Sequence, residues 1–431
     1  MIKKIKIYIT LAAVAFSSVS CLDKYPEDAI PEGDAIRTVE EANQAVIGIY
    51  AYMKNPNLYS GLLTLLPDLQ ADLAYAVEGY TNTYGNIWRW DILPTNTEVE
   101  AVYGTLNALI GKCNFLLERI AVLEQEVDDE DYEKLQQFKG EALFARALSY
   151  SDLIKMYCKA YDPATAADEL GVVLVSSYSN AGTLKRASLK DSYQFVLDDL
   201  AQSATCLKPD ENENDESYYD TPYFTIYAVN ALYARVYLNM QEWDKAIEYA
   251  SKVIDSRKFK LSSTTEMIDS ETSYYQYMWQ YDHSTETIWK VGFTTTSYGG
   301  SLGQIFFNYD FNSFKPDYVP AEWVLNLYAD TDLRATTFFQ SYRTGYEHGL
   351  QWPLLAKYFG NQEFYEQNIL HVTMPKVFRL SEQYLIRAEA YCQKSNPEYG
   401  KGANDLTTLR QARYSNYGSA SLTEENWFKE I

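Results

Sequence analysis

Aromatic and amide side chains are concentrated in two stretches of the sequence that lack helical or strand periodicity. The first, Glu78–Asn96, reads EGYTNTYGNIWRWDILPTN, and the second, residues 258–318, is rich in Ser, Thr, Tyr and Gly. Aromatic rings can stack on the apolar face of a ligand while amides hydrogen-bond its rim. We therefore predict that loops in these stretches bind a polar ligand with flat faces. The candidate residues are Tyr84, Asn86, Trp88 and Trp90 in the first stretch and Trp279, Tyr281, Tyr298 and Asn308 in the second.

Burial in a loop-rich core is the alternative for each of these aromatic residues, because most tryptophans in folded proteins are largely buried. We therefore expect at least two of them, rather than all, to line the site. Trp289 differs from the others because it alternates within an apolar run, Thr287–Phe293. That pattern predicts a short strand with Trp289 in the core.

One stretch matches a catalytic motif. Residues 299–303 read GGSLG, which fits the G-x-S-x-G nucleophile elbow of α/β-hydrolases, with Ser301 as the nucleophile. The other triad members could come from residues downstream, namely Asp310, His348 and His371. The elbow needs a parallel sheet and a helix directly after the serine, but residues 304–312 show no helical face. We interpret the motif as a Gly/Ser loop and keep a serine hydrolase as an alternative.

Other catalytic and metal-binding chemistry has weaker support. The acidic pairs Asp68/Asp72 and Asp128/Asp129 could serve a glycosidase, but such pairs in acidic helices are more often solvated or capping residues. The chain has three histidines and no HExxH or Gly-rich phosphate loop. The cysteines after residue 21 are scattered, which argues against a zinc site: Cys113, Cys158, Cys206 and Cys392. Three of the four lie in helical patterns, so we expect buried free thiols, and a disulfide in an exported protein is the alternative. We expect no metal, no cofactor and no enzymatic activity.

Composition limits the possible partners. The chain has 431 residues, 47% hydrophobic residues and a formal net charge of −22. This apolar content predicts a packed globular protein. The negative charge repels phosphate backbones, and no basic patch with interleaved aromatics is present, so we expect no nucleic-acid binding.

The N-terminus has the pattern of an export signal. A basic start is followed by the apolar run Ile5–Val19, which is too short for a mature membrane span, and then by small residues and Cys21. We predict a signal peptide over residues 1–20 and lipidation of Cys21, although Ser18 is a weak residue three positions before the cysteine. Residues 21–37 would form a lipidated tether to a membrane. The alternative is a plain secretory peptide with an incidental cysteine.

The segment Thr225–Ser256 provides the clearest scaffold signal. Its apolar residues recur at helical spacing on both sides of a short break at residues 241–242, which predicts two amphipathic helices. Ala234, Tyr237 and Ala246 stand at positions typical of a tetratricopeptide unit. Because one such hairpin cannot bury its apolar faces alone, other helix pairs must stack on it. An ordinary helical hairpin in an unrelated bundle is the alternative.

Helical patterns elsewhere predict a mostly α fold. Tetratricopeptide-like helix pairs are expected over residues 98–256 and 379–414, with a loop-rich ligand-binding lobe over residues 258–375. A pattern that starts at Thr423 stops with the chain at Ile431, so we expect the sequence to continue further. The individual helices are predicted at 38–54, 67–77, 98–126, 132–157, 188–207, 320–328, 336–342, 379–394 and 403–414, with a strand-like run at 172–175.

Two specific motifs resemble those of a known family. Gly140–Ala147 (GEALFARA), continued by Tyr150, Asp152 and Tyr157, resembles a signature of SusD/RagB-type outer-membrane lipoproteins of Bacteroidetes. Pro375–Ala390 is similar to their C-terminal R-L-x-E-x-Y-L-x-x-A-E-A motif. Three weaker stretches also fit the family, although Thr407 stands where Asn is common: Ser192–Leu200, Asp332–Arg334 and Leu409–Arg413. The family's last block is absent.

The resemblance implies a SusD-like domain over residues 38–431, built on four tetratricopeptide-like pairs. It further implies a lipid-anchored protein on the outside of the outer membrane that binds nutrients without chemistry. A SusC-like TonB-dependent transporter would be its partner. The ligand would be an oligosaccharide, whose apolar ring faces suit aromatic side chains and whose hydroxyl groups suit Asn, Asp and Arg. Some relatives handle peptides, so a peptide ligand is the alternative.

Overall fold

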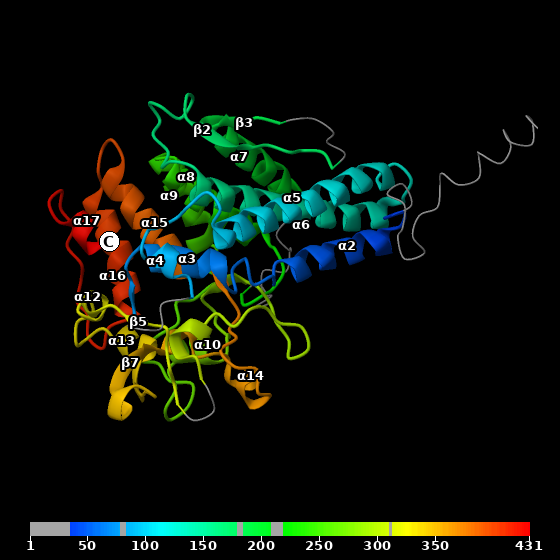
Figure 1. Cartoon of the computed structure of the whole chain (residues 1–431). Coiled ribbons are helices and arrows are strands. Elements are labelled where there is room, and N and C mark those ends of the chain that lie inside the picture. Colours follow the sequence, from blue (N-terminus) through cyan, green and yellow to red (C-terminus); the bar gives the residue numbers. More distant parts are fainter. Residues whose placement is uncertain (1–34, 78–82, 179–183, 208–218, 310–312) are drawn as a thin grey trace, which may run out of the picture.

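The computed structural model of the chain describes residues 35–77, 83–178, 184–207, 219–309 and 313–431. The predicted signal peptide, Cys21 and most of the tether lie outside these residues, as does Asp310. Figure 1 shows long helices stacked in one part of the molecule, with short helices, strands and loops gathered below them.

The long helices α5 and α6 form the centre of the helical part. α5 spans Thr97–Leu123 and α6 spans Asp129–Tyr157, and both pack on α2, Val39–Tyr52. Each helix begins at a side-chain oxygen that accepts a hydrogen bond from a backbone N–H three residues on, namely at Thr38, Asn96 and Asp128. These caps satisfy N–H groups that have no partner inside the helix. The three predicted helices are confirmed, with ends that differ by at most three residues.

The hairpin predicted over Thr225–Ser256 is present as α8, Ile226–Asn239, and α9, Trp243–Ile254. Ala234 and Ala246 are fully buried and cluster with the small or aliphatic residues Ala250, Ile386 and Ala390. The last two belong to α15, Leu380–Gln393, which returns from late in the sequence to pack on α9. Small side chains at these crossings let the helix axes approach closely.

The remaining scaffold helices extend this stack. α7, Leu189–Cys206, packs on α6, and α16, Tyr399–Gln411, packs on α15. The strands β2, Leu170–Val173, and β3, Arg186–Ser188, pair before α7, and α17, Trp427–Glu430, is the last helix. The fold is therefore mostly helical, as predicted. None of the described helices combines the length and apolarity needed to cross a membrane.

Three predicted helices were wrong in extent. The helix expected over residues 67–77 starts earlier, as α3 at Leu62–Gln70, and the chain then forms strand β1, Ala74–Ala76. The apolar run from Leu62 to Leu66 begins the helix, and Asp72 ends it with a left-handed backbone (φ 56°). The helix expected over residues 336–342 ends at Phe338 (α13, Arg334–Phe338), because the following residues pair as a strand. The helix expected over residues 320–328 is the single turn α12, Glu322–Leu325.

The lobe consists of short elements. Its sequence suggested few helices, yet α10 forms at Tyr274–Gln280 with a capping box between Ser273 and Gln276. In the described part of the chain the named strands form antiparallel pairs: β1 with β5, β2 with β3, β4 with β8 and β6 with β7. The parallel sheet of an α/β-hydrolase is therefore not found among the described strands. The other lobe elements are β4 (Thr287–Lys290), α11 (Gln304–Phe307), β5 (Tyr318–Pro320), β6 (Phe339–Arg343), η3 (Glu347–Gly349), β7 (Gln351–Leu355), η4 (Ala356–Tyr358), α14 (Gln362–Glu366) and β8 (Lys376–Arg379).

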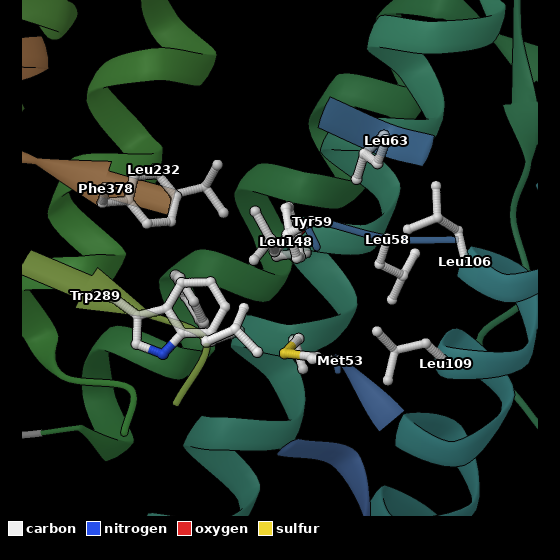
Figure 2. Packing of buried hydrophobic residues seen from close by; sticks show 14 of the residues in the cluster. Met53, Leu58, Tyr59, Leu63, Leu106, Leu109, Leu148, Leu232, Trp289 and Phe378 are labelled. Carbon is white, nitrogen blue, oxygen red and sulfur yellow. The ribbon is translucent and has the colours of Figure 1, made fainter. Parts of the chain in front are cut away.

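The scaffold and the lobe share one hydrophobic core. Figure 2 shows Trp289 of β4 and Phe378 of β8 beside Leu232 of α8, with Met53 and Leu58 deeper among the helices. Trp289 is fully buried, which confirms the predicted core position. Its indole N–H donates to the carbonyl of Pro222 at 2.9 Å, so the one polar atom of the ring is satisfied.

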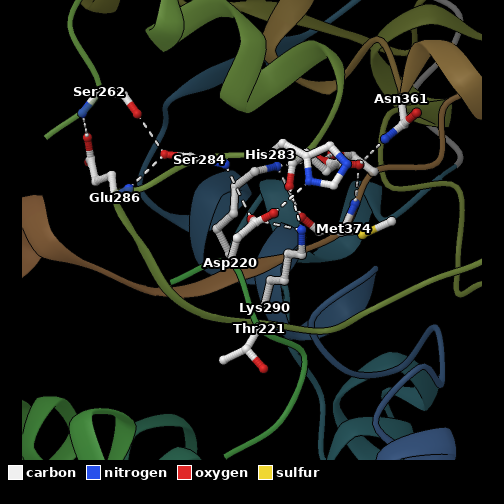
Figure 3. Close-up of polar contacts among 12 residues, drawn as sticks. Asp220, Thr221, Ser262, His283, Ser284, Glu286, Lys290, Asn361 and Met374 are labelled. Atoms are coloured by element: carbon white, nitrogen blue, oxygen red, sulfur yellow. Dashed lines mark hydrogen bonds and ion pairs between the residues drawn. The ribbon is translucent and has the colours of Figure 1, made fainter. Parts of the chain in front are cut away.

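A buried polar network reinforces this junction (Figure 3). The ammonium of Lys290 lies 2.8 Å from a carboxylate oxygen of Asp220, whose other oxygen contacts His283 at 2.6 Å. Glu286 accepts from the backbone N–H of Ser262 at 2.9 Å and pairs with Arg413 of the C-terminal segment at 2.6 Å. Buried charges of this kind are tolerated only when they are paired and hydrogen-bonded.

Candidate ligand-binding site

The described part of the first aromatic stretch, residues 83–96, forms a turn. Its centre is the short helix α4, Gly85–Trp88, which the sequence did not predict. Trp90 exposes 64% of its surface and has a left-handed backbone (φ 58°). Asn86 is exposed and Tyr84 is half-buried, also with a left-handed backbone (φ 57°). The turn therefore presents one indole and one amide to solvent.

Trp88 faces inward and supports this turn. Its indole N–H donates to the carbonyl of Ala74 at 2.9 Å, and its ring lies edge-on to Tyr318, with centroids 6.4 Å apart. Ala74 belongs to β1 and Tyr318 to β5, so Trp88 fixes the turn to the pair of strands. Trp88 therefore contributes to the packing beneath the candidate site more than to its exposed surface.

A small hollow lies in the same turn, at α4. It has a volume of about 140 Å³ and is lined by Tyr84, Asn86, Arg89, Asn96 and Glu98, among others. The guanidinium of Arg89 donates to the amide oxygen of Asn86 at 3.0 Å. Burial, together with the negative charge of Glu98, raises the pKa of Tyr84 above its ordinary value, so its hydroxyl remains a donor at neutral pH. The hollow thus offers hydroxyl, amide, guanidinium and carboxylate groups to a hydroxylated ligand.

Two further exposed aromatics belong to the elements that support this turn, and the sequence did not single them out. Tyr75 in β1 exposes 47% of its surface, and Trp323 in α12 exposes 43%. The indole N–H of Trp323 donates to the carbonyl of Asp72 at 3.1 Å, which brings the segment after β5 beside the start of β1. The alternation in residues 74–76 was the available signal for Tyr75. We define the Trp90 surface as Tyr75, Tyr84, Asn86, Trp90 and Trp323.

The second aromatic group is not brought together. Tyr281 stacks on Tyr277, with ring centroids 4.8 Å apart, whereas Tyr298 is 46% exposed and lies near Phe364 at 6.5 Å. Asn308 is half-buried and accepts from Gln304, the start of its own one-turn helix, at 3.0 Å. These three residues have separate surroundings and form no common cluster by the contacts of the described chain.

Trp279 lies in a helix, not in the predicted loop, and is only 8% exposed. It lines a cavity of about 550 Å³ between the scaffold and the lobe. Three cationic groups surround its ring: Lys357 at 4.8 Å, Lys376 at 5.0 Å and Arg379 at 5.4 Å from the centroid. We call this space the Trp279 cavity.

The GGSLG stretch is a tightly packed turn. An added Cβ at Gly303 would clash with the backbone carbonyl of Tyr358, and one at Gly300 would meet the carbonyl of Ser60 at 2.8 Å. The glycines are therefore explained by close packing. His371 is fully buried, donates from Nδ1 to the carbonyl of Phe359 at 3.0 Å and stacks on Phe307. No interaction between His371 and Ser301 is present in the described structure.

The candidate carboxylate pairs have structural positions. Asp128 caps α6, and Asp72 lies in the left-handed turn after α3. Burial raises the pKa of Asp68, and the nearby Lys357 partly offsets this effect. No disulfide joins the four described cysteines; Cys113 and Cys392 are buried, as expected, whereas Cys158 and Cys206 are half-buried. Among the described residues, no cluster of three or more His, Cys, Asp or Glu side chains could hold a metal ion.

The motif residues that carry the family resemblance hold the scaffold together. Arg146 forms a bidentate pair with Asp199 at 2.8 and 2.6 Å and also donates to Asn114. Gly140 allows α7 to approach, because a Cβ there would lie 2.7 Å from that of Cys206. In the C-terminal motif, Arg379 pairs with Glu286, Glu382 with Arg235 and Arg387 with Asp405. These paired motif residues therefore stabilise the fold.

Comparisons with known proteins agree with the architecture. Residues 22–238 match a SusD-like family whose description is "Starch-binding associating with outer membrane". SusD-like protein P2 of Formosa agariphila is 23% identical over 257 residues, which cover 59% of this chain and 46% of that protein. The chain thus spans about half the length of this curated relative.

Solved structures cover most of the chain. A SusD superfamily protein from Bacteroides thetaiotaomicron superposes with a TM-score of 0.74 and 22% identity, covering 90% of this chain and 83% of that one. Surface glycan-binding protein A from Bacteroides uniformis gives a TM-score of 0.70 and 17% identity, covering 91% and 84%. At these identities the likeness shows a shared fold.

Proposed function

The chain belongs to the SusD-like family, and we propose that it is a cell-surface lipoprotein that captures oligosaccharides for uptake. The family consists of binding proteins and not enzymes, so Ser301 has no catalytic role in this proposal. The Trp90 surface would be the glycan-binding site, and the chain would pass its ligand to a SusC-like TonB-dependent transporter.

The exposed indole of Trp90 is the observation that carries the proposal. An indole that exposes 64% of its surface is rarely left in water without a partner, since tryptophan is normally largely buried. The same turn carries Asn86 and Arg89, which line a small hollow with Tyr84 and Glu98, so one segment supplies an apolar ring together with donors and acceptors. This combination suits a sugar ring, which has an apolar face and a hydroxylated rim.

The support for the membrane location comes from the family description and the N-terminal sequence. The matched family associates with the outer membrane, and Cys21 follows an export signal. Several acyl chains on one cysteine anchor a protein stably. Labelled palmitate should be incorporated into the wild-type chain and not into Cys21→Ser, and intact cells should be stained by an antibody to the wild-type protein. Absence of labelling in the wild type would contradict the anchor.

The ligand is tested with the soluble chain from residue 22. Maltohexaose, cellohexaose, xylohexaose and mannohexaose would be titrated in a calorimeter against the wild type and Trp90→Ala. We expect at least one of them to bind and the variant to lose affinity by about 30-fold, as for truncation of a binding hot spot of about 2 kcal/mol. Phe428→Ala is the matched control, because Phe428 is 84% exposed but lies at the C-terminal end.

A peptide ligand is the competing outcome. Hexapeptides of mixed sequence would be titrated alongside the sugars. If only peptides bind, and Trp90→Ala abolishes their binding, the glycan assignment is wrong while the site assignment holds. Delivery is tested by cross-linking in cells, in which a TonB-dependent barrel should be recovered with the lipoprotein.

A further inference from the structure

The Trp279 cavity lies between the helical scaffold and the lobe. Its volume of about 550 Å³ is within the range of small-molecule sites, about 300–1,000 Å³. Residues of α3, α6, α8 and α15 form one side, and Trp279, Lys357 and residues 373–377 contribute the other. The exposed Lys155 is also part of the lining, so the cavity reaches the surface. It is separate from the residues of the Trp90 surface.

Two of the three cations around Trp279 have carboxylate partners. Lys376 is bonded to the buried Asp282, whose oxygens also accept from Thr373 at 2.7 Å. Arg379 lies 3.2 Å from a carboxylate oxygen of Glu286. Burial pushes the pKa of Glu286 upward, but Arg413 and Arg379 outweigh it and hold the pKa below its usual value. Lys376 and Arg379 therefore each already have a carboxylate acceptor.

Lys357 differs from its neighbours. Its ammonium lies over three aromatic rings, at 4.8 Å from Trp279, 4.9 Å from Tyr358 and 5.4 Å from Phe338. It has no hydrogen bond or ion pair with any residue that the structure describes. Burial lowers the pKa of Lys357 to about 8, with Arg379 and Lys376 adding to the decrease and Asp68 opposing it. The ring faces attract a cation but accept no strong hydrogen bond, so three ammonium donors remain available.

The donors of this cavity suit an anionic group. The indole N–H of Trp279 is also buried without a hydrogen-bond partner, so two neighbouring residues, Trp279 and Lys357, have donors that lack an acceptor. A buried donor without an acceptor costs free energy that a bound acceptor restores. In a chain with a net charge of −22, local positive charge of this kind is what a negatively charged ligand would require.

The rest of the wall limits the kind of anion. Three carboxylates line the cavity, Asp152, Glu382 and Glu389, together with apolar residues such as Pro67 and Leu302. These carboxylates would accept from ligand hydroxyls but would repel a ligand that carries several charges close together. A sugar with one carboxylate and several hydroxyls meets both conditions better than a multiply sulfated one.

We propose that the Trp279 cavity binds a hexuronic-acid unit of a short acidic oligosaccharide, with the carboxylate held by Lys357. The class of ligand rests on the proposed glycan-binding function, but the site does not depend on the Trp90 surface. The protein would then have two sugar sites of different charge preference. The neutral part of a mixed polysaccharide would stack on Trp90, and an acidic unit would occupy the cavity.

The test uses trigalacturonic acid and triglucuronic acid, with neutral galactotriose as the matched sugar. Calorimetry with the chain from residue 22 should detect at least one acidic trisaccharide, and Lys357→Met should weaken it by about 10- to 100-fold, the value of a charge-assisted hydrogen bond. Lys357→Arg should retain most of the affinity. Lys252→Met is the matched control, because Lys252 also lies over a ring, that of Tyr249, but on the scaffold surface.

The alternatives give distinct results. Failure of both acidic trisaccharides to bind the wild type, or equal affinity in Lys357→Met, would overturn the proposal. Tighter binding of galactose 6-sulfate, inorganic sulfate or trialanine than of the acidic trisaccharides would assign the cavity to another ligand. That result would also overturn the hexuronic-acid proposal. Trp90→Ala should leave the affinity for the acidic trisaccharide unchanged. If this variant loses only the binding of neutral sugars, the loss belongs to the Trp90 surface and the proposal for the cavity stands. Thermal unfolding of each variant checks that the fold is intact.

Discussion

Trp90 and Trp279 come from similar-looking stretches of sequence but have opposite surroundings. Trp90 exposes 64% of its surface, whereas Trp279 exposes 8% and is surrounded by three cations. The local sequence around both is aromatic and polar without a clear period. What separates them is the set of residues that the fold brings opposite each ring. Exposure therefore depends on distant parts of the chain, and the two sites should respond differently to mutation.

Replacing Trp279 with Ala should have the largest effect. The change removes a buried ring and the face that screens Lys357, Lys376 and Arg379 from one another. We expect the free energy of unfolding to fall by about 3–5 kcal/mol. Trp90→Ala should change it by less than about 0.5 kcal/mol. Urea unfolding of both variants measures the contrast, and equal losses would remove the distinction between the two sites.

The second expectation concerns binding at the exposed site. Trp90→Ala should cost about 2 kcal/mol of affinity for a neutral hexasaccharide while its unfolding curve remains that of the wild type. Adding Trp323→Ala should weaken binding further if both indoles belong to one platform. A Trp323→Ala effect no larger than that of Phe428→Ala would restrict the platform to Trp90.

A third variant tests the cavity through stability. The pKa of Lys357 is lowered to about 8, so between pH 8 and its unfolded value of about 10.5 the unfolded chain binds more protons. The contribution of Lys357 to the free energy of unfolding therefore rises with pH across that window. At pH 7 this contribution is lower than it is above pH 10. Lys357→Met should be more stable than the wild type by about 1 kcal/mol at pH 7, with the difference fading above pH 10. Lower stability at pH 7 would show that the ammonium is already well satisfied.

The smallest expected effect is the acid response of the lobe core. Burial lowers the pKa of His371 despite its hydrogen bond to Phe359. The unfolded chain therefore takes up a proton first as the pH falls below about 6.5, and stability decreases through that range. His371→Phe should keep the stack on Phe307 and flatten the pH dependence of the melting temperature. An unchanged slope between pH 7 and pH 5 would assign the acid response to other groups.

Much of the fold could be predicted from local periodicity. The stripe through α8 and α9 and the caps at Thr38, Asn96 and Asp128 are properties of adjacent residues, so the sequence displays them directly. α10 was missed because its seven residues, YYQYMWQ, are too few to show a helical period. Its signal was the pair Ser273 and Gln276, which form a capping box.

The candidate sites were less predictable. Trp279 is covered by Lys357, Lys376 and Arg379, which lie far along the chain and have no local pattern that points to it. Tyr75 and Trp323 belong to neighbouring elements because β1 pairs with β5. Such pairings follow from tertiary packing, which periodicity does not report. Sequence reasoning therefore named Tyr84, Asn86 and Trp90 of the proposed surface and missed Tyr75 and Trp323.

The pairing of β1 with β5 has a consequence for biogenesis. The bond from Trp323 to Asp72 joins residues 251 positions apart, and closing so long a loop is slow unless intervening structure forms first. We expect the scaffold helices to fold before these strands meet. The bond between Trp323 and Asp72 would then form late, after the helices that hold β1 and β5 in place.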